Sequence, residues 1–154
     1  MVTFSKILKE VRDFAESEVP LDLLLIAVNE SKAEFTNRVF NSESGTKDTK
    51  GKGLGKYSNS YANYRRSIGR QTNNVDLELT GSLRRDLKTI RKENSISMQF
   101  LATDEVKKIG YLETQYKTPI FDLSEEEKNG VNQKANKLFM NEINNIIKNG
   151  ISGK

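Results

Sequence analysis

Hydrophobic residues recur every three or four positions near the start of the chain, which predicts a helix over residues 3–17. Proline tolerates the first turn of a helix but not its interior, so Pro20 marks the start of a second helix that should run to Phe40. We expect the two helices to meet in a corner near Val19. The apolar face of the first helix consists of Phe4, Ile7, Leu8, Val11 and Phe14.

The middle of the chain changes to alternating patterns that are typical of strands. Apolar residues alternate with acidic ones over residues 75–79 and predict a short strand. Residues 96–100 alternate more cleanly and predict a strand with one buried and one polar face, entered through a hairpin turn at residues 92–94. Between these strands Leu83 and Leu87 are four apart, so this stretch forms either a single helical turn or the first strand of the hairpin.

Helical spacing returns in the last third of the chain. An acidic first turn and an apolar face predict a helix over residues 103–115, which the step at Pro119 ends. Ser124 and Glu127 have the spacing of a capping box, in which each side chain accepts a hydrogen bond from the other's backbone N–H. The last helix should therefore begin there and stop near Gly150.

Together these elements predict a single α+β domain over residues 1–154, with long N- and C-terminal helices packed on a small antiparallel β-sheet. Three parts follow one another along the chain. They are the N-terminal helices (1–40), a basic arm with an aromatic and arginine-rich segment (41–72), and the β-hairpin with the C-terminal helices (73–154).

The composition narrows the classes of function. Only 35% of the residues are hydrophobic and 30% are charged, so we expect a small core and a wide polar surface. The absence of Cys and His removes thiol and imidazole groups as nucleophiles, bases and metal ligands, and we expect no enzymatic activity, cofactor or metal. The most apolar stretch, residues 21–28, is too short to cross a bilayer, so we expect a soluble protein without a membrane partner, made in a cytoplasm.

Charge is distributed unevenly along the chain. Residues 45–92 hold twelve basic and four acidic residues, a net charge of +8, whereas the remainder holds thirteen and seventeen, a net charge of −4. Such a split favours head-to-tail association of identical subunits or binding to nucleic acid. Residues 41–56 combine four Gly with four Lys and predict a long exposed interaction arm, without the upstream strand and spacing of a phosphate-binding loop. Its candidate interface residues are Lys47, Lys50, Lys52 and Lys56.

Tyrosines and arginines alternate over residues 57–70 at helical spacing, which predicts a short helix with an aromatic and a basic face. Such a segment can stack bases on its rings and neutralise phosphates. The alternative is that the tyrosines pack on the core and the arginines meet an acidic neighbour. The candidate residues are Tyr57, Tyr61, Tyr64, Arg65, Arg66 and Arg70.

Three consecutive carboxylates, Glu125, Glu126 and Glu127, begin the last helix. Carboxylates are ligands for hard cations, but consecutive helical residues point in different directions. The helix dipole alone stabilises an acidic first turn, and we favour this structural interpretation of the three glutamates over a cation site. These residues are the acidic surface that we expect the lysines of a neighbouring subunit's arm to face.

Two short motifs occur in a fixed order along the chain. A T-G-x-L step, Thr80, Gly81 and Leu83, precedes the predicted hairpin, and a P-x-F step, Pro119 and Phe121, precedes the last predicted helix. Their order resembles the tail-completion, or virion-morphogenesis, family of tailed bacteriophages, in which the first step leads into a β-hairpin and the second, after a short helix, introduces the C-terminal helix. Residues 38–40, the Gly- and Lys-rich residues 50–55 and the Tyr and Arg string over residues 57–70 are also similar to proteins of this kind in related phages, so the resemblance covers residues 38–147. Many members carry a P-x-R-P-F version of the second step, which this chain lacks.

The resemblance implies a structural subunit of the virion without chemistry of its own. It would form a homo-oligomeric ring at the neck, or head–tail joint, or at the top of the tail, and would contact the portal or adaptor and the tail proteins. Non-specific contact with genomic DNA would come from the genome passing through the ring. The alternative function is that of a small basic nucleic-acid-binding phage accessory protein. We also expect Gly81 to adopt a positive φ, since it lies between two elements.

Overall fold

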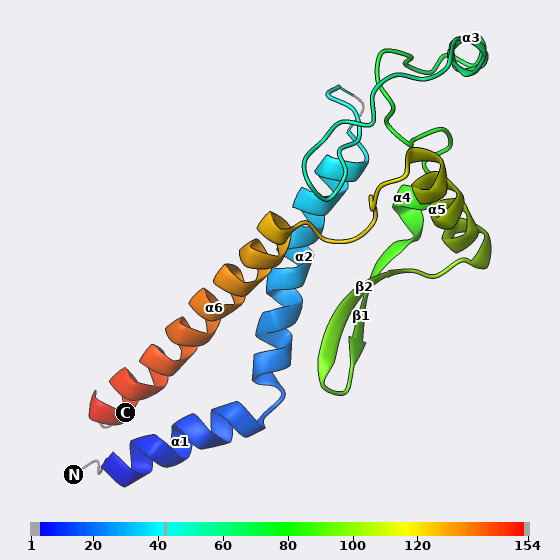
Figure 1. Ribbon diagram of the computed structural model, residues 1–154. Coiled ribbons are helices and arrows are strands. Elements are labelled where there is room, and N and C mark those ends of the chain that lie inside the picture. The colour runs from blue at the N-terminus through cyan, green and yellow to red at the C-terminus, as the bar shows by residue number, and fades with distance from the viewer. Residues whose placement is uncertain (1–3, 42, 153–154) are drawn as a thin grey trace.

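The computed structural model describes residues 4–41 and 43–152, which form six helices and one two-stranded antiparallel sheet (Figure 1). This confirms the predicted α+β fold with long helices towards both ends. In chain order the elements are α1 (Phe4–Glu16), α2 (Val19–Val39), α3 (Asn59–Ser67), α4 (Ser82–Asp86), β1 (Leu87–Lys92), β2 (Ser95–Phe100), α5 (Thr103–Tyr116) and α6 (Glu125–Ser152).

Helices α1, α2 and α6 form a triangular frame (Figure 1). α1 and α2 meet at the predicted corner, where the backbone N–H of Val19 donates to the hydroxyl of Ser17 at 3.2 Å. α6 packs along α2, and α1 returns across to the C-terminal part of α6. There Gly150 is buried, and a Cβ at this position would lie 2.8 Å from Cγ1 of Ile7. Glycine thus permits the close approach of the two helices.

The hydrophobic core is small and lies where the C-terminal half of α2 meets α4, the hairpin and the segment before α6. Ile120 and Val39 are fully buried within it. Phe121 packs on its edge, with its ring centroid 5.7 Å from that of Phe100 in an edge-to-face arrangement. The buried members of this core are Phe35, Val39, Phe40, Leu83, Leu87 and Ile120.

The hairpin pairs the six residues of β1 with the six of β2 and lies beside α2. Lys32 of α2 donates to the carbonyl oxygen of Leu87 at 2.7 Å, and Arg91 forms ion pairs with Glu18 and Asp22 near the α1–α2 corner. The sequence left open whether the stretch after Gly81 forms a helical turn or the first strand of the hairpin. Both are present, because the helical turn of α4 leads directly into β1.

The strand predicted over residues 75–79 is wrong. Val75 is bonded to loop backbone, with its N–H donating to Gly55 at 3.0 Å and its carbonyl accepting from Thr46 at 2.6 Å. Asp76, which the alternation assigned to a solvent face, is 2% exposed. Leu77 adopts φ +51°, which breaks an extended backbone. Burial of the aspartate therefore decided the conformation of this segment, against the hydrophobic alternation.

The chain exposes an unusually large surface for its mass. Its accessible area is 10176 Å² at 17.5 kDa, whereas the area–mass relation for folded monomers gives about 7,900 Å². The surplus is about 2,300 Å². It arises because the three frame helices, the hairpin and α3 extend away from a small core (Figure 1).

Candidate interaction surfaces

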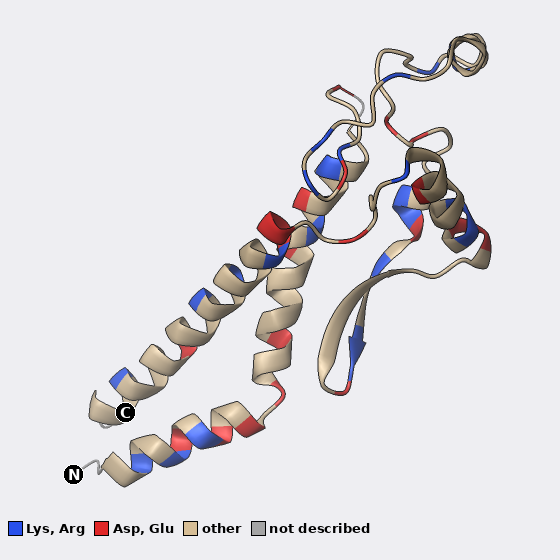
Figure 2. Cartoon of the chain, viewed as in Figure 1, with Lys and Arg blue, Asp and Glu red and all other residues tan. Residues whose placement is uncertain are grey.

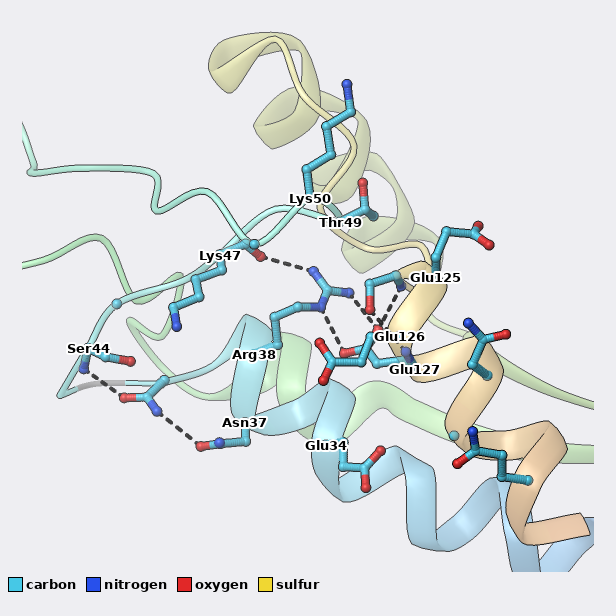
Figure 3. A pocket seen from close by; sticks show the side chains of 17 residues that line it. Glu34, Asn37, Arg38, Ser44, Lys47, Thr49, Lys50, Glu125, Glu126 and Glu127 are labelled. Atoms are coloured by element: carbon cyan, nitrogen blue, oxygen red, sulfur yellow. Dashed lines mark hydrogen bonds and ion pairs between the residues drawn. The ribbon is translucent and has the colours of Figure 1, made fainter.

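Arg38, near the end of α2, joins three segments of the chain at one point (Figure 3). Its guanidinium makes a two-pronged ion pair with Glu127 of α6, Nε to Oε1 at 2.8 Å and Nη2 to Oε2 at 3.1 Å. It also donates to the carbonyl oxygens of Lys47 at 2.9 Å, Ile120 at 3.0 Å and Asp122 at 2.6 Å. A planar fork with five donors suits this task, which a lysine ammonium would perform poorly.

The capping box at the start of α6 is confirmed. The N–H of Ser124 donates to Glu127 Oε2 at 2.8 Å, and the N–H of Glu127 donates to Ser124 Oγ at 3.1 Å. Because Glu127 both caps the helix and pairs with Arg38, it is only 5% exposed. The expectation that Glu127 faces a neighbouring subunit is therefore wrong.

A polar cleft of about 1030 Å³ opens beside this junction (Figure 3). Lys47 and Lys50 line it from the loop, and Glu125 and Glu126 line it from the first turn of α6. Two of the four lysines that we expected to meet the glutamates of another subunit, Lys47 and Lys50, thus border the same cleft as those glutamates within a single chain. A hydrogen bond from Lys128 to Glu125 at 2.7 Å raises the pKa of that lysine.

The loop over residues 43–56 is not the free arm that its composition predicts. The hydroxyl of Thr46 donates to the carbonyl of Val39 at 2.6 Å, and the N–H of Thr49 donates to the carbonyl of Pro119 at 3.1 Å. Thr46 is fully buried. Lys47 bridges to Gly53 across the loop. The backbone is thereby folded onto its own domain, while the lysine side chains remain exposed.

Asp48 organises this loop from within and is 4% exposed. Its Oδ1 accepts the backbone N–H groups of Lys50 and Lys52, each at 2.9 Å, and its Oδ2 accepts the hydroxyl of Thr118 at 2.8 Å. Burial alone would raise the pKa of this carboxyl, but the hydrogen bonds from Thr118, Lys52 and Lys50 favour the charged form and lower it.

A second buried ion pair lies near α3. Arg65 is 1% exposed and donates from Nη2 to both carboxylate oxygens of Asp76 at 2.9 and 3.0 Å. Its guanidinium carbon lies 4.4 Å from the centroid of the Tyr57 ring, and the Tyr57 hydroxyl donates to Asp76 at 2.8 Å. Burial, reinforced by the neighbouring carboxylate, raises the pKa of Tyr57. Arg65 and Tyr57 are thus internal, and the prediction that Arg65 reaches a partner is wrong.

The remaining candidates in this segment do face outwards. Tyr61, Tyr64, Arg66 and Arg70 are exposed. Ser58 caps the start of α3, where its hydroxyl accepts the N–H of Tyr61 at 3.4 Å. Figure 2 shows basic residues along the loops that lead to α3. Of the candidate arginines and tyrosines, these are the ones available to a partner.

Sequence reasoning missed Arg38, Asp48 and Asp76, which organise the junction and the loops. One signal was available for the aspartates. Asp48 and Asp76 are two of the four acidic residues in the basic segment over residues 45–92. Both are buried, and both accept hydrogen bonds from donors in that segment. A lone carboxylate in a basic segment is a good candidate for an internal partner, since buried charges must be paired.

The residues of the two family motifs surround the core. Gly81 adopts φ +72°, which confirms the expected left-handed conformation. Leu83 is buried in the core, Thr80 accepts from Arg85 at 3.0 Å through its carbonyl, and Pro119 accepts from the loop. Phe121 packs against the core. These motif positions therefore have structural roles.

A cavity of about 570 Å³ lies between α3, α5 and the segment before α4. Four of the five tyrosines line it, namely Tyr57, Tyr61, Tyr111 and Tyr116. Burial raises the pKa of Tyr116. Glu105 also lines it; its Oε1 accepts from Lys108 at 2.7 Å, while its buried Oε2 has no hydrogen-bond partner among the residues that the structure describes.

No family model, curated protein or solved structure matches this chain. In residues 4–41 and 43–152, no three or more Asp or Glu side chains are grouped to hold a metal ion. None of the described helices has the length and apolarity needed to cross a membrane.

Proposed function

We propose that this chain is a structural subunit of a tailed-bacteriophage virion, in a ring at the head–tail joint, the neck or the top of the tail. The resemblance of its T-G-x-L and P-x-F steps to the tail-completion family supports this role. The position of these motif residues around the core also supports this role, because residues that line a core preserve a fold and do not form a reaction centre.

The surplus of exposed surface is the observation that carries the proposal. A ring subunit makes two contacts, and a standard interface buries roughly 800 Å² on each partner, about 1,600 Å² for two. The surplus exposed area of about 2,300 Å² is larger than the area that two such interfaces would bury on one subunit. Neighbouring subunits that pack on its helices would bury this exposed surface.

Purified virions of the phage that encodes this chain provide the test. Mass spectrometry should detect the chain in intact particles. Deleting its gene should yield capsids and tails that fail to join, or tails that end improperly, when the lysate is viewed by electron microscopy. Normal infectious particles without the chain would overturn the proposal.

The second candidate function is nucleic-acid binding by the exposed side of α3. Tyr61 and Tyr64 lie beside Arg66 and Arg70, all exposed, which is the combination that stacks bases and neutralises phosphates. Binding of single-stranded DNA by the isolated chain that falls steeply between 50 and 200 mM salt, roughly tenfold or more, would favour this function. Burial of Arg65 against Asp76 removes one of its phosphate contacts and makes it the weaker candidate.

A further inference from the structure

The large hydrophobic residues that the chain exposes lie on two groups of elements, the frame helices and the region of α3 and α5, and α1 and α3 lie at opposite ends of the molecule (Figure 1). One set lies on the frame helices and is called the helical end: Phe4, Leu8, Val19, Ile26, Met140 and Ile151. The other lies on or beside α3 and α5 and is called the tyrosine end: Tyr61, Tyr64, Ile68, Leu101, Val106 and Tyr111. The most exposed members, Phe4 and Tyr111, are each 74% exposed.

Two different apolar surfaces at opposite ends are what a head-to-tail contact between identical subunits requires. A twofold dimer uses the same patch on both partners, whereas a heterologous contact joins two distinct patches and closes into a ring when the rotation allows. The large apolar residues named at both ends stay exposed within the described chain, although α1 itself packs against α6, and α1 has no buried residue.

The N-terminal segment of the helical end and the α3 segment of the tyrosine end carry opposite charge. Residues 4–22 hold three basic and five acidic residues, and because Arg91 of β1 pairs with Glu18 and Asp22, a net charge of −1 remains there. Residues 56–70 hold four basic residues and no acidic one. Of these four, only Arg65 is neutralised internally, by Asp76, and the other three face outwards. The signs would attract the helical end of one copy to the tyrosine end of another.

We propose that the helical end of one copy docks on the tyrosine end of the next, with Phe4 and Leu8 of α1 seated in the tyrosine-lined cavity. This inference rests on the proposed function, because it names a second copy as the partner that completes a ring subunit. The cavity volume, about 570 Å³, lies within the range of roughly 300–1,000 Å³ for pockets that enclose a bound group.

Cross-linking between single-cysteine variants tests this contact directly, because the natural chain contains no cysteine. Leu8→Cys places a thiol on the helical end, and Tyr111→Cys places one at the mouth of the cavity. Glu93→Cys, at the exposed hairpin turn, is the matched control. Each purified full-length variant is treated alone and in pairs with a short bismaleimide, which reacts with two thiols, and is then separated on a denaturing gel.

The mixture of Leu8→Cys and Tyr111→Cys should give a covalent dimer at least about tenfold more abundant than either variant alone or the mixture of Leu8→Cys with Glu93→Cys. A chain carrying both substitutions should give a ladder of higher oligomers. A dimer formed by Leu8→Cys alone would show a twofold contact and overturn the proposal. So would equal yields in all mixtures, or no dimer in any.

The cross-linking result and the virion result can fail separately. Detection of the chain in virions together with no specific cross-link would leave the structural role in place and remove this contact. A specific cross-link from a chain that virions lack would establish the head-to-tail contact and remove the phage role.

Discussion

The loop over residues 43–56 and helix α1 lie at opposite ends of α2 and differ in what holds them. The loop contributes one large apolar residue, Leu54, yet Thr46 and Asp48 within it are almost completely buried. α1 has a well-formed apolar face but buries no residue. Hydrogen bonds to specific partners bury these polar residues of the loop. In contrast, α1 leaves Phe4 and Leu8 exposed and the rest of its apolar face only half-buried.

This difference shows that a residue of this chain is buried where it has a bonding or packing partner, whether the segment that carries it is polar or apolar. The buried side chains of the loop, Thr46 and Asp48, find donors or acceptors in α2, the segment before α6 and the loop itself. An apolar helix face is covered only when another surface has the right shape and lies within reach, and α1 meets only part of α6. The polar region should therefore lose more stability to substitution than the helical end.

The largest effect is expected for Arg65→Ala. The change leaves the carboxylate of Asp76 buried without its ionic partner, which typically costs about 3–5 kcal/mol of unfolding free energy. Arg66→Ala is the matched control, since Arg66 is exposed and should change stability by less than about 0.5 kcal/mol. Urea denaturation followed by circular dichroism measures both. Equal midpoints for the two variants would show that the buried pair contributes nothing and would break the comparison.

Substitution of Arg38 should come next. Arg38→Ala removes five hydrogen bonds and leaves Glu127 unpaired, at an expected loss of about 3 kcal/mol. Arg38→Lys keeps the charge but not the fork, so it should lose about half as much. Both values come from the same denaturation experiment. A lysine variant as stable as the natural chain would mean that charge alone, and not the planar geometry, joins α2 to α6.

Gly81→Ala should lose about 1–2 kcal/mol, because φ +72° is unfavourable for any residue with a Cβ. The added Cβ would also lie 2.9 Å from Nη1 of Arg85, which is flexible enough to move. Gly53→Ala is the control, since its φ is not positive and nothing lies within 4 Å of its Cβ position. That variant should be neutral or slightly more stable. The same melting temperature in both variants would exclude backbone strain at Gly81.

The features that sequence alone predicted correctly are local ones. The capping box of Ser124 and Glu127 and the left-handed Gly81 depend on neighbours a few residues away, so their patterns carry the information. The roles of Arg38 and Arg65 depend on partners 89 and 11 residues away, and no spacing rule pairs them. Residues 75–79 failed as a strand for the same reason. Their alternation was real, but Asp76 is buried and paired with Arg65, eleven residues earlier.

A pH dependence should separate Asp48 from the exposed carboxylates of the helical end. An aspartate in the unfolded chain has a pKa of about 3.9, and the hydrogen bonds of the folded loop lower the pKa of Asp48 below that value. A lowered folded-state pKa means that the ionised group stabilises the fold above about pH 4 and that this contribution is lost as pH falls through the folded pKa.

Asp48→Asn cannot titrate at this position, so its melting temperature should fall less between pH 7 and pH 3 than that of the natural chain. Thr118→Val, which removes one of the three donors, should lie between the two. Thermal melts at both pH values measure the difference. If the two chains lose the same number of degrees, the loop is not held by this carboxylate.

The smallest effect is expected for Leu8→Ala, although it deletes a large apolar side chain. Leu8 is 52% exposed, so at low protein concentration the variant should lose less than about 0.5 kcal/mol. Leu83→Ala makes the same chemical change at a residue 6% exposed in the core and should lose about 2–5 kcal/mol. Denaturation of both variants across a range of concentrations measures the contrast. If α1 docks on a second copy, the loss for Leu8→Ala should grow with concentration, because assembly stabilises the natural chain by mass action. A large loss at the lowest concentration would show instead that α1 is as firmly held as the loop, and the difference between the two regions would disappear.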